Sequence, residues 1–111
     1  MTESEFIVLA ERTLGAIEAA FERAAEESDA DIESSRSGNV LEIEFVDNGS
    51  KIIVNSQTPM QEIWVAARSG GFHFRREEER WINTRDGSDL FDTLSATASA
   101  QAGMALTIAP E

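Results

Sequence analysis

Cysteine is absent from the 111 residues, and histidine occurs once, at His73. Without a thiol, the chain has no disulfide, no thiolate metal ligand and no cysteine nucleophile. The lone histidine falls in no recognisable triad pattern, so the sequence gives no sign of nucleophilic catalysis. An ordinary hydrolase or transferase is therefore not expected, and only acid–base chemistry among the many carboxylates stays open.

Long apolar runs are also missing, and none approaches the roughly 20 residues that a membrane helix needs. The opening residues, MTESEF, have neither the basic nor the apolar region of a signal peptide. We therefore expect a soluble, cytoplasmic protein that does not enter a membrane. Its length suits one domain over residues 1–111, with one core.

Positive charge is scarce, with nine basic residues against 21 acidic ones and a net charge of −12. Such a surface repels the phosphates of nucleic acids and of anionic membranes. Neither is expected as a partner. A cation or a basic protein surface is attracted instead.

The N-terminal region predicts a helix over residues 3–26. Thr2 and Glu5 have the spacing of a capping box. Apolar residues recur at steps of three and four and form one stripe: Phe6, Leu9, Ala10, Thr13, Leu14, Ile17, Ala20, Phe21 and Ala24.

Another side of this helix is acidic, because Glu18, Glu22 and Glu26 follow one another at intervals of four. Like charges at this spacing weaken a helix by roughly 0.2–0.5 kcal/mol per pair, and acids near its C-terminus oppose the helix dipole. Most acidic helix faces are only solvated surface. The unfavourable electrostatics of this one nevertheless favour a functional role.

Alternating residues then predict a series of strands. In 29–33 the acids Asp29, Asp31 and Glu33 share one face of a short strand, and in 39–46 Glu42 and Glu44 point away from the core. Asn48-Gly49 predicts a hairpin turn, and residues 76–80 a charged turn. The remaining strands are expected at 51–55, 61–67, 72–74 and 81–83, followed by a helix near 89–101 capped by Ser88.

This order of elements predicts an α+β fold, because short connections favour antiparallel neighbours. We expect a two-layer α-β sandwich with the N- and C-terminal helices packed on one face of a five- to six-stranded antiparallel sheet. The short apolar tail after Gly103 is expected along the core. The other sheet face is then open to solvent.

Trp64 is the notable residue of that open face, because it lies in phase with Glu62 rather than with Ile63 and Val65. An exposed tryptophan is typical of protein–protein contacts. The pattern alone leaves equally open that a neighbouring strand or the tail covers it. His73, also on this face, is more often a surface residue than a ligand.

The available metal ligands are oxygens, which suit hard cations such as Mg²⁺, Ca²⁺, Mn²⁺ and ferric iron. A row of exposed carboxylates without a cage predicts weak and unselective cation binding. It describes an electrostatic surface rather than a tight site.

These residues also carry a family resemblance. The run NGSKIIVNSQTPMQEIWVA, with Asn55, Gln57, Pro59 and Ile63-Trp64 in fixed spacing, is similar to the bacterial frataxins, the CyaY family. The opening SEF, the run DADIE and GGFHF match as well, so the resemblance extends from Ser4 to about Gly103.

The resemblance implies an iron-binding regulator or adaptor of iron–sulfur cluster assembly that binds the cysteine desulfurase–scaffold complex. Iron would be weakly held, with other divalent cations as competitors, and the protein mainly monomeric, with iron-dependent oligomers open. By position, the metal-binding acids would be Glu18, Glu22, Glu26, Glu27, Asp29, Asp31 and Glu33. The partner-binding residues would be Glu42, Glu44, Asn55, Gln57, Trp64 and His73.

Two alternatives remain open at this point. One is a ferroxidase or an iron-storage or iron-donor protein, although the first helix lacks the histidine that a ferritin-like di-iron site uses. The other is an acidic interaction module without a metal role. We expect no enzyme, with weak ferroxidase activity left open.

Overall fold

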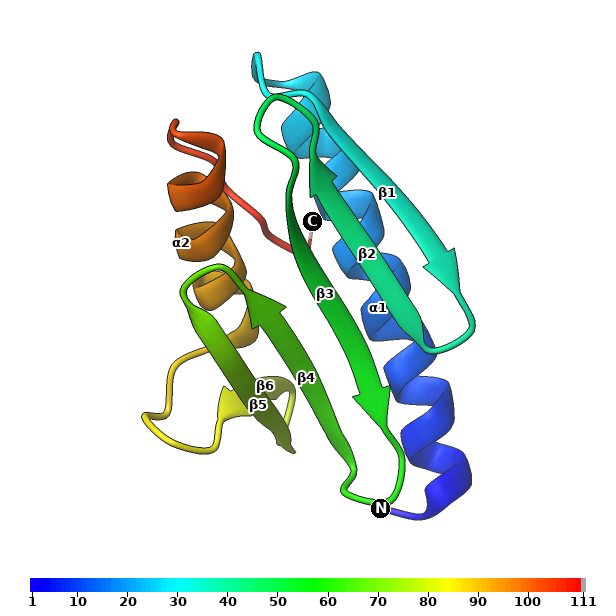
Figure 1. Cartoon of the computed structure of the whole chain (residues 1–111). Coiled ribbons are helices and arrows are strands. Elements are labelled where there is room, and N and C mark those ends of the chain that lie inside the picture. Colours follow the sequence, from blue (N-terminus) through cyan, green and yellow to red (C-terminus); the bar gives the residue numbers. More distant parts are fainter. Residues whose placement is uncertain (111) are drawn as a thin grey trace.

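The computed structural model describes residues 1–110, which form two helices and one six-stranded antiparallel sheet (Figure 1). The strands lie side by side in chain order. Both helices lie on one side of the sheet, as the sequence predicts. The elements are α1 (Glu3–Glu26), β1 (Ile32–Ser37), β2 (Val40–Phe45), β3 (Ser50–Gln57), β4 (Glu62–Ala67), β5 (Gly70–Glu77), β6 (Arg80–Asn83) and α2 (Leu90–Ala102).

Helix α1 begins with the predicted capping box. The Thr2 hydroxyl accepts a hydrogen bond from the Glu5 backbone N–H, and Glu5 Oε1 accepts one from the Thr2 backbone N–H at 2.7 Å. The latter bond lowers the pKa of the Glu5 carboxyl below its usual value. Except for half-buried Leu9, the predicted apolar stripe of α1 is buried along its length.

The sheet register follows from the hairpin turns and from apolar alternation. Gly49 adopts a φ of +72° in the turn between β2 and β3, which favours glycine. This turn pairs Leu41 with Val54 and Ile43 with Ile52, and all four side chains face the helices.

Two predicted segments are wrong in their bounds. β1 begins only at Ile32, opposite Phe45, so Asp29 and Asp31 precede the strand and share no strand face with Glu33. The charged turn predicted at 76–80 is shorter, because β5 continues to Glu77 and pairs it with Arg80.

The start of α2 is also shifted from the prediction. Asp89, rather than Ser88, is the N-cap, and its Oδ2 accepts hydrogen bonds from the backbone N–H groups of Phe91 and Asp92. A capping carboxylate fits this position because it complements the helix dipole.

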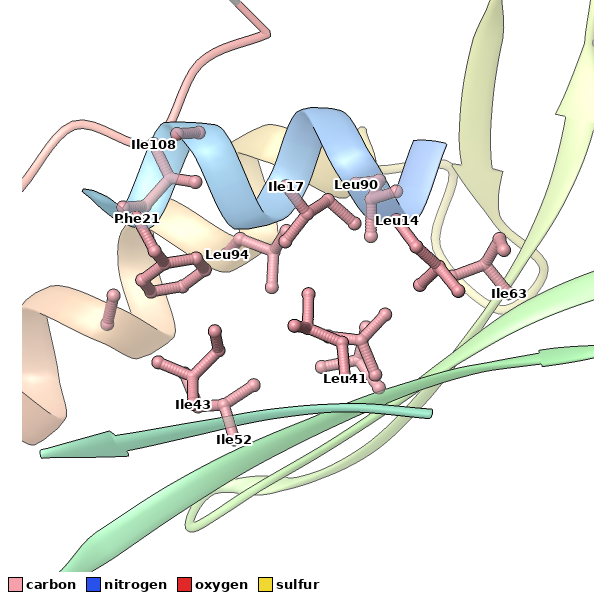
Figure 2. Packing of buried hydrophobic residues seen from close by; sticks show 14 of the residues in the cluster. Leu14, Ile17, Phe21, Leu41, Ile43, Ile52, Ile63, Leu90, Leu94 and Ile108 are labelled. Carbon is pink, nitrogen blue, oxygen red and sulfur yellow. The ribbon is translucent and has the colours of Figure 1, made fainter. Parts of the chain in front are cut away.

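The core lies between the helices and the sheet, where Leu14, Ile17 and Phe21 of α1 face Leu41 and Ile43 of β2 (Figure 2). The tail after α2 closes one side of this core, with Leu106 and Ile108 buried, which confirms the prediction for the tail. Arg23 holds the tail by donating to the Ala109 carbonyl oxygen at 2.8 Å. This arrangement leaves the opposite face of the sheet without a covering layer.

The described part of the chain contains no helix that is both long and apolar enough to cross a membrane.

Candidate functional site

The seven acids named as metal ligands lie in one continuous stretch at the end of α1 and the start of β1. We call them the acidic ridge: Glu18, Glu22, Glu26, Glu27, Asp29, Asp31 and Glu33. Glu18 is half-buried and the other six are exposed. Their carboxylates are therefore in contact with water and reachable from outside.

Basic side chains near the ridge are engaged elsewhere. Arg23 points to the Ala109 carbonyl of the tail, and Arg36 of β1 pairs with Glu11, which lies outside the ridge. Among residues 1–110, no acid of the ridge forms an ion pair. The negative charge of the ridge is thus left to solvent ions or to a partner.

The ridge carboxylates do not converge on a point. Within the described residues, no group of three or more histidine, aspartate or glutamate side chains is arranged to hold one metal ion. The ridge is instead a row, in which a cation meets few ligands at a time. Such a surface attracts cations through its summed field rather than through a coordination cage.

Glu42 and Glu44 flank the ridge on the open face of β2, and both are half-buried. Glu44 lies between Glu33 of β1 and Lys51 of β3 in the strand register. Lys51 also forms an ion pair with Glu42 at 3.3 Å. Unlike the ridge, this pair of acids is partly neutralised, which the sequence pattern did not predict.

The open face of β3, β4 and β5 carries the remaining predicted contact residues in two rows. Asn55, Trp64 and His73 lie opposite one another in one row. The second row places Gln57, Glu62 and Arg75 opposite one another. These six residues form what we call the open-face cluster.

Trp64 is half-buried within this cluster. Its indole stacks on the His73 imidazole, with ring centroids 4.2 Å apart and planes 6° from parallel. Its Nε1–H donates a hydrogen bond to Glu62 Oε1 at 2.8 Å. The ring thus lies on the open face, as its phase predicts, but side chains of the sheet itself shield part of it.

Two members of the cluster, Glu62 and Arg75, were not predicted from the sequence. Glu62 is buried, with only 4% of its surface exposed, and its Oε2 accepts a hydrogen bond from Arg75 Nη2 at 2.8 Å. The signal available in the sequence was the opposite charge of these two residues, once β4 and β5 are paired across the turn at Arg68-Ser69.

One end of the cluster borders a small hollow. A hollow of about 110 Å³ lies beside His73, between β5 and residues 83–86. Pockets for small ligands usually exceed about 300 Å³.

Comparison with known proteins gives a consistent result. A family model described as a frataxin-like domain matches residues 1–104. An "Iron-sulfur cluster assembly protein CyaY" of Cupriavidus taiwanensis is 64% identical over 107 residues, which cover 96% of each chain. A protein of the same name from Janthinobacterium sp. (strain Marseille) is 63% identical over 108 residues, 97% of this chain and 96% of the relative.

Solved structures agree with these sequence matches. Frataxin from Psychromonas ingrahamii superposes with a TM-score of 0.81 at 32% identity, and the match covers 98% of this chain and 99% of that one. Trimeric yeast frataxin, a structure described as complexed with ferrous iron, has a TM-score of 0.72 at 24% identity, with 93% and 88% covered. This second likeness concerns the fold alone.

Proposed function

Because the chain belongs to the frataxin family, we propose that it serves iron–sulfur cluster assembly as an iron-binding regulator or adaptor. In this proposal, the acidic ridge holds iron, and the ridge and the open-face cluster together bind a cysteine desulfurase–scaffold complex. The names of the relatives support the assembly role. The observation on this chain that supports it best is that, within residues 1–110, no acid of the ridge pairs with a basic side chain.

The ridge suits iron that is held weakly and released easily. Carboxylate oxygens are hard ligands, which favour ferric iron and divalent cations over soft metals. Because no three acidic or histidine side chains converge in residues 1–110, each ion keeps most of its water. Other divalent cations therefore compete for the ridge.

The negative electrostatic field of the acidic ridge also suits a basic patch on the partner. Complementary charge speeds association and fixes orientation, and its effect falls as salt screens it. Trp64 then supplies the apolar anchor next to the amides of Asn55 and Gln57. We propose a mainly monomeric protein, with oligomers that depend on iron.

A ferroxidase or iron-storage role is the weaker alternative. Oxidation at a di-iron centre needs several carboxylates, usually with histidine, around two adjacent ions. The single histidine, His73, lies on the open-face cluster rather than on the ridge. The ridge geometry favours attraction of iron over its oxidation.

Charge reversal on α1 tests the ridge directly. The triple variant Glu18→Lys, Glu22→Lys, Glu26→Lys should weaken binding to the desulfurase–scaffold complex by at least about tenfold at low salt. The loss should shrink as salt rises, because screening reduces the contribution of the ridge in the wild type. Binding is measured by calorimetry over a salt series.

A matched control reverses three acids at the opposite edge of the sheet. Glu77, Glu78 and Glu79 are exposed around the turn between β5 and β6, and their change to lysine alters net charge equally. We expect the control to bind nearly as the wild type does. Equal losses in both variants would assign the effect to net charge, and unchanged affinity in the ridge variant would remove the ridge from the proposal.

The ridge variant should not be less stable than the wild type. Lysines near a helix C-terminus complement the dipole that the glutamates oppose. If the variant melts at the same temperature as the wild type or higher and still binds more weakly, the loss of binding is due to a lost contact and not to unfolding.

Iron binding has its own measurement. Ferrous iron is titrated anaerobically into labelled protein, and amide signals are followed by NMR. Perturbation confined to residues 18–33 supports the ridge as the iron surface. Unperturbed ridge signals would instead favour an acidic interaction module without a metal role, and oxygen consumption on aeration would revive the ferroxidase alternative.

A further inference from the structure

Glu62 is unusual because its carboxylate is buried on the face of the sheet that no helix covers. Its side chain is 5% exposed, whereas Arg75 and His73 beside it are 60% and 49% exposed. One carboxylate oxygen accepts from the Trp64 indole N–H and the other from Arg75, each at 2.8 Å. His73 Nδ1 lies 3.8 Å from the oxygen that Trp64 also uses.

Stability alone does not account for this arrangement. Burying a carboxylate is unfavourable, and its pairing with arginine offsets that cost only in part. An apolar side chain of similar volume at such a position is often as stable or more so. What an apolar residue could not do is accept the indole N–H and the guanidinium at the same time.

We propose that Glu62 is a positioning residue of the open-face cluster. Its carboxylate fixes the Trp64 indole in one orientation, stacked on His73, before any partner arrives. Arg75 holds the carboxylate in turn, through the oxygen that the indole leaves free. This inference rests on the proposed docking role of Trp64 and adds the residue that orders it.

The expected benefit is a smaller entropic cost of binding. Ordering one flexible side chain at an interface weakens affinity by roughly two- to tenfold, and a side chain already fixed in the free protein avoids that loss. Glu62 therefore acts on affinity through Trp64 rather than by touching the partner. Its near-complete burial leaves the carboxylate little surface for direct contact.

Two variants at this position separate positioning from mere packing. Glu62→Met keeps the length of the side chain but removes both acceptors. Glu62→Gln keeps one acceptor for the indole N–H while it loses the charge that holds Arg75. Each is compared with Trp64→Ala, which removes the proposed anchor itself.

The two indole N–H signals in the NMR spectrum give a readout within the free protein. Trp64 donates to Glu62, whereas Trp81 donates to the buried Thr13 Oγ1 at 3.0 Å and serves as an internal reference. In Glu62→Met we expect the Trp64 signal to shift and to exchange faster with solvent, with Trp81 unchanged. Glu62→Gln should keep the Trp64 signal near its wild-type position.

Affinity for the desulfurase–scaffold complex completes the test. We expect a loss of about two- to tenfold in Glu62→Met, a larger loss in Trp64→Ala and substantial recovery in Glu62→Gln. A Glu62→Met protein with unchanged indole exchange, or with wild-type affinity while Trp64→Ala binds weakly, would overturn the positioning role. If Trp64→Ala binds as tightly as the wild type, the docking proposal fails, whatever the indole signals of Glu62→Met show.

Discussion

Trp64 and Trp81 place the same side chain on opposite faces of one sheet. Each indole N–H donates one hydrogen bond, to Glu62 on the open face and to Thr13 of α1 on the covered face. Trp81 is 3% exposed and meets Phe6 of α1 edge to face, with ring centroids 6.2 Å apart. Trp64 is half-buried.

The difference lies in what packs over the two rings. A helix covers Trp81, so its ring joins two layers of the fold. The aromatic and polar partners of Trp64 come from β4 and β5, so its ring joins only neighbouring strands. A similar hydrogen bond therefore stabilises the core at Trp81 and orders a surface side chain at Trp64. Measurements of stability should distinguish these two roles.

Removal of the Trp81 ring should have the largest effect. Trp81→Ala leaves a cavity between β6 and α1 and leaves Phe6 without its aromatic partner. The expected loss in free energy of unfolding is about 3–5 kcal/mol, as for other buried aromatic truncations. Urea denaturation measures it, and a loss below about 1 kcal/mol would show that the ring is not part of the core.

The hydrogen bond of Trp81 should contribute a smaller, separable share. Thr13→Val keeps the side-chain shape but leaves the buried indole N–H without an acceptor, which costs about 1–3 kcal/mol. Thr97→Val is the matched control, because Thr97 is equally buried and its hydroxyl donates only to carbonyl oxygens of its own helix.

The control should lose clearly less stability than Thr13→Val does. Equal losses in the two variants would mean that the indole N–H finds another partner, and that the hydrogen bond adds little to the burial of the ring. The same denaturation curves supply this comparison.

The sequence predicts the face of Trp64, since alternation sets the side on which a strand residue leaves. It does not decide the face of Trp81, whose strand is only four residues long. Helix α1 and the hairpin of β2 and β3 could also be predicted from the sequence. An apolar stripe and a capping box indicate the helix, and Asn48-Gly49 indicates the hairpin turn. The acids at 29–33 alternate just as regularly. Strand pairing, however, begins only at Ile32, which pairs with Phe45, and no local sequence pattern specifies where the pairing starts.

Burial on the open face was not predictable in the same way. A glutamate in phase with solvent is expected to be exposed, and Glu62 is not, because Trp64, His73 and Arg75 enclose it. Two of these neighbours, His73 and Arg75, lie on the next strand, β5, and Arg75 is 13 residues away in the chain. Whether they enclose Glu62 depends on how the side chains of the two paired strands are oriented, and the spacing of residues along the chain does not specify that orientation.

Trp64→Ala should have the smallest effect on stability and the clearest effect on docking. Cross-strand pairs contribute roughly 0.2–1 kcal/mol, so the loss of the stack on His73 should cost about 1 kcal/mol or less. Glu62 keeps Arg75 as a partner for one oxygen, and removal of the ring from the uncovered face lets water reach the other, so the carboxylate is not left buried and unpaired. The variant should therefore melt close to the wild type yet bind the desulfurase–scaffold complex more weakly, by calorimetry on protein shown to be folded. A loss of stability as large as that of Trp81→Ala would place Trp64 in the structural core, and the contrast between the two faces would then disappear.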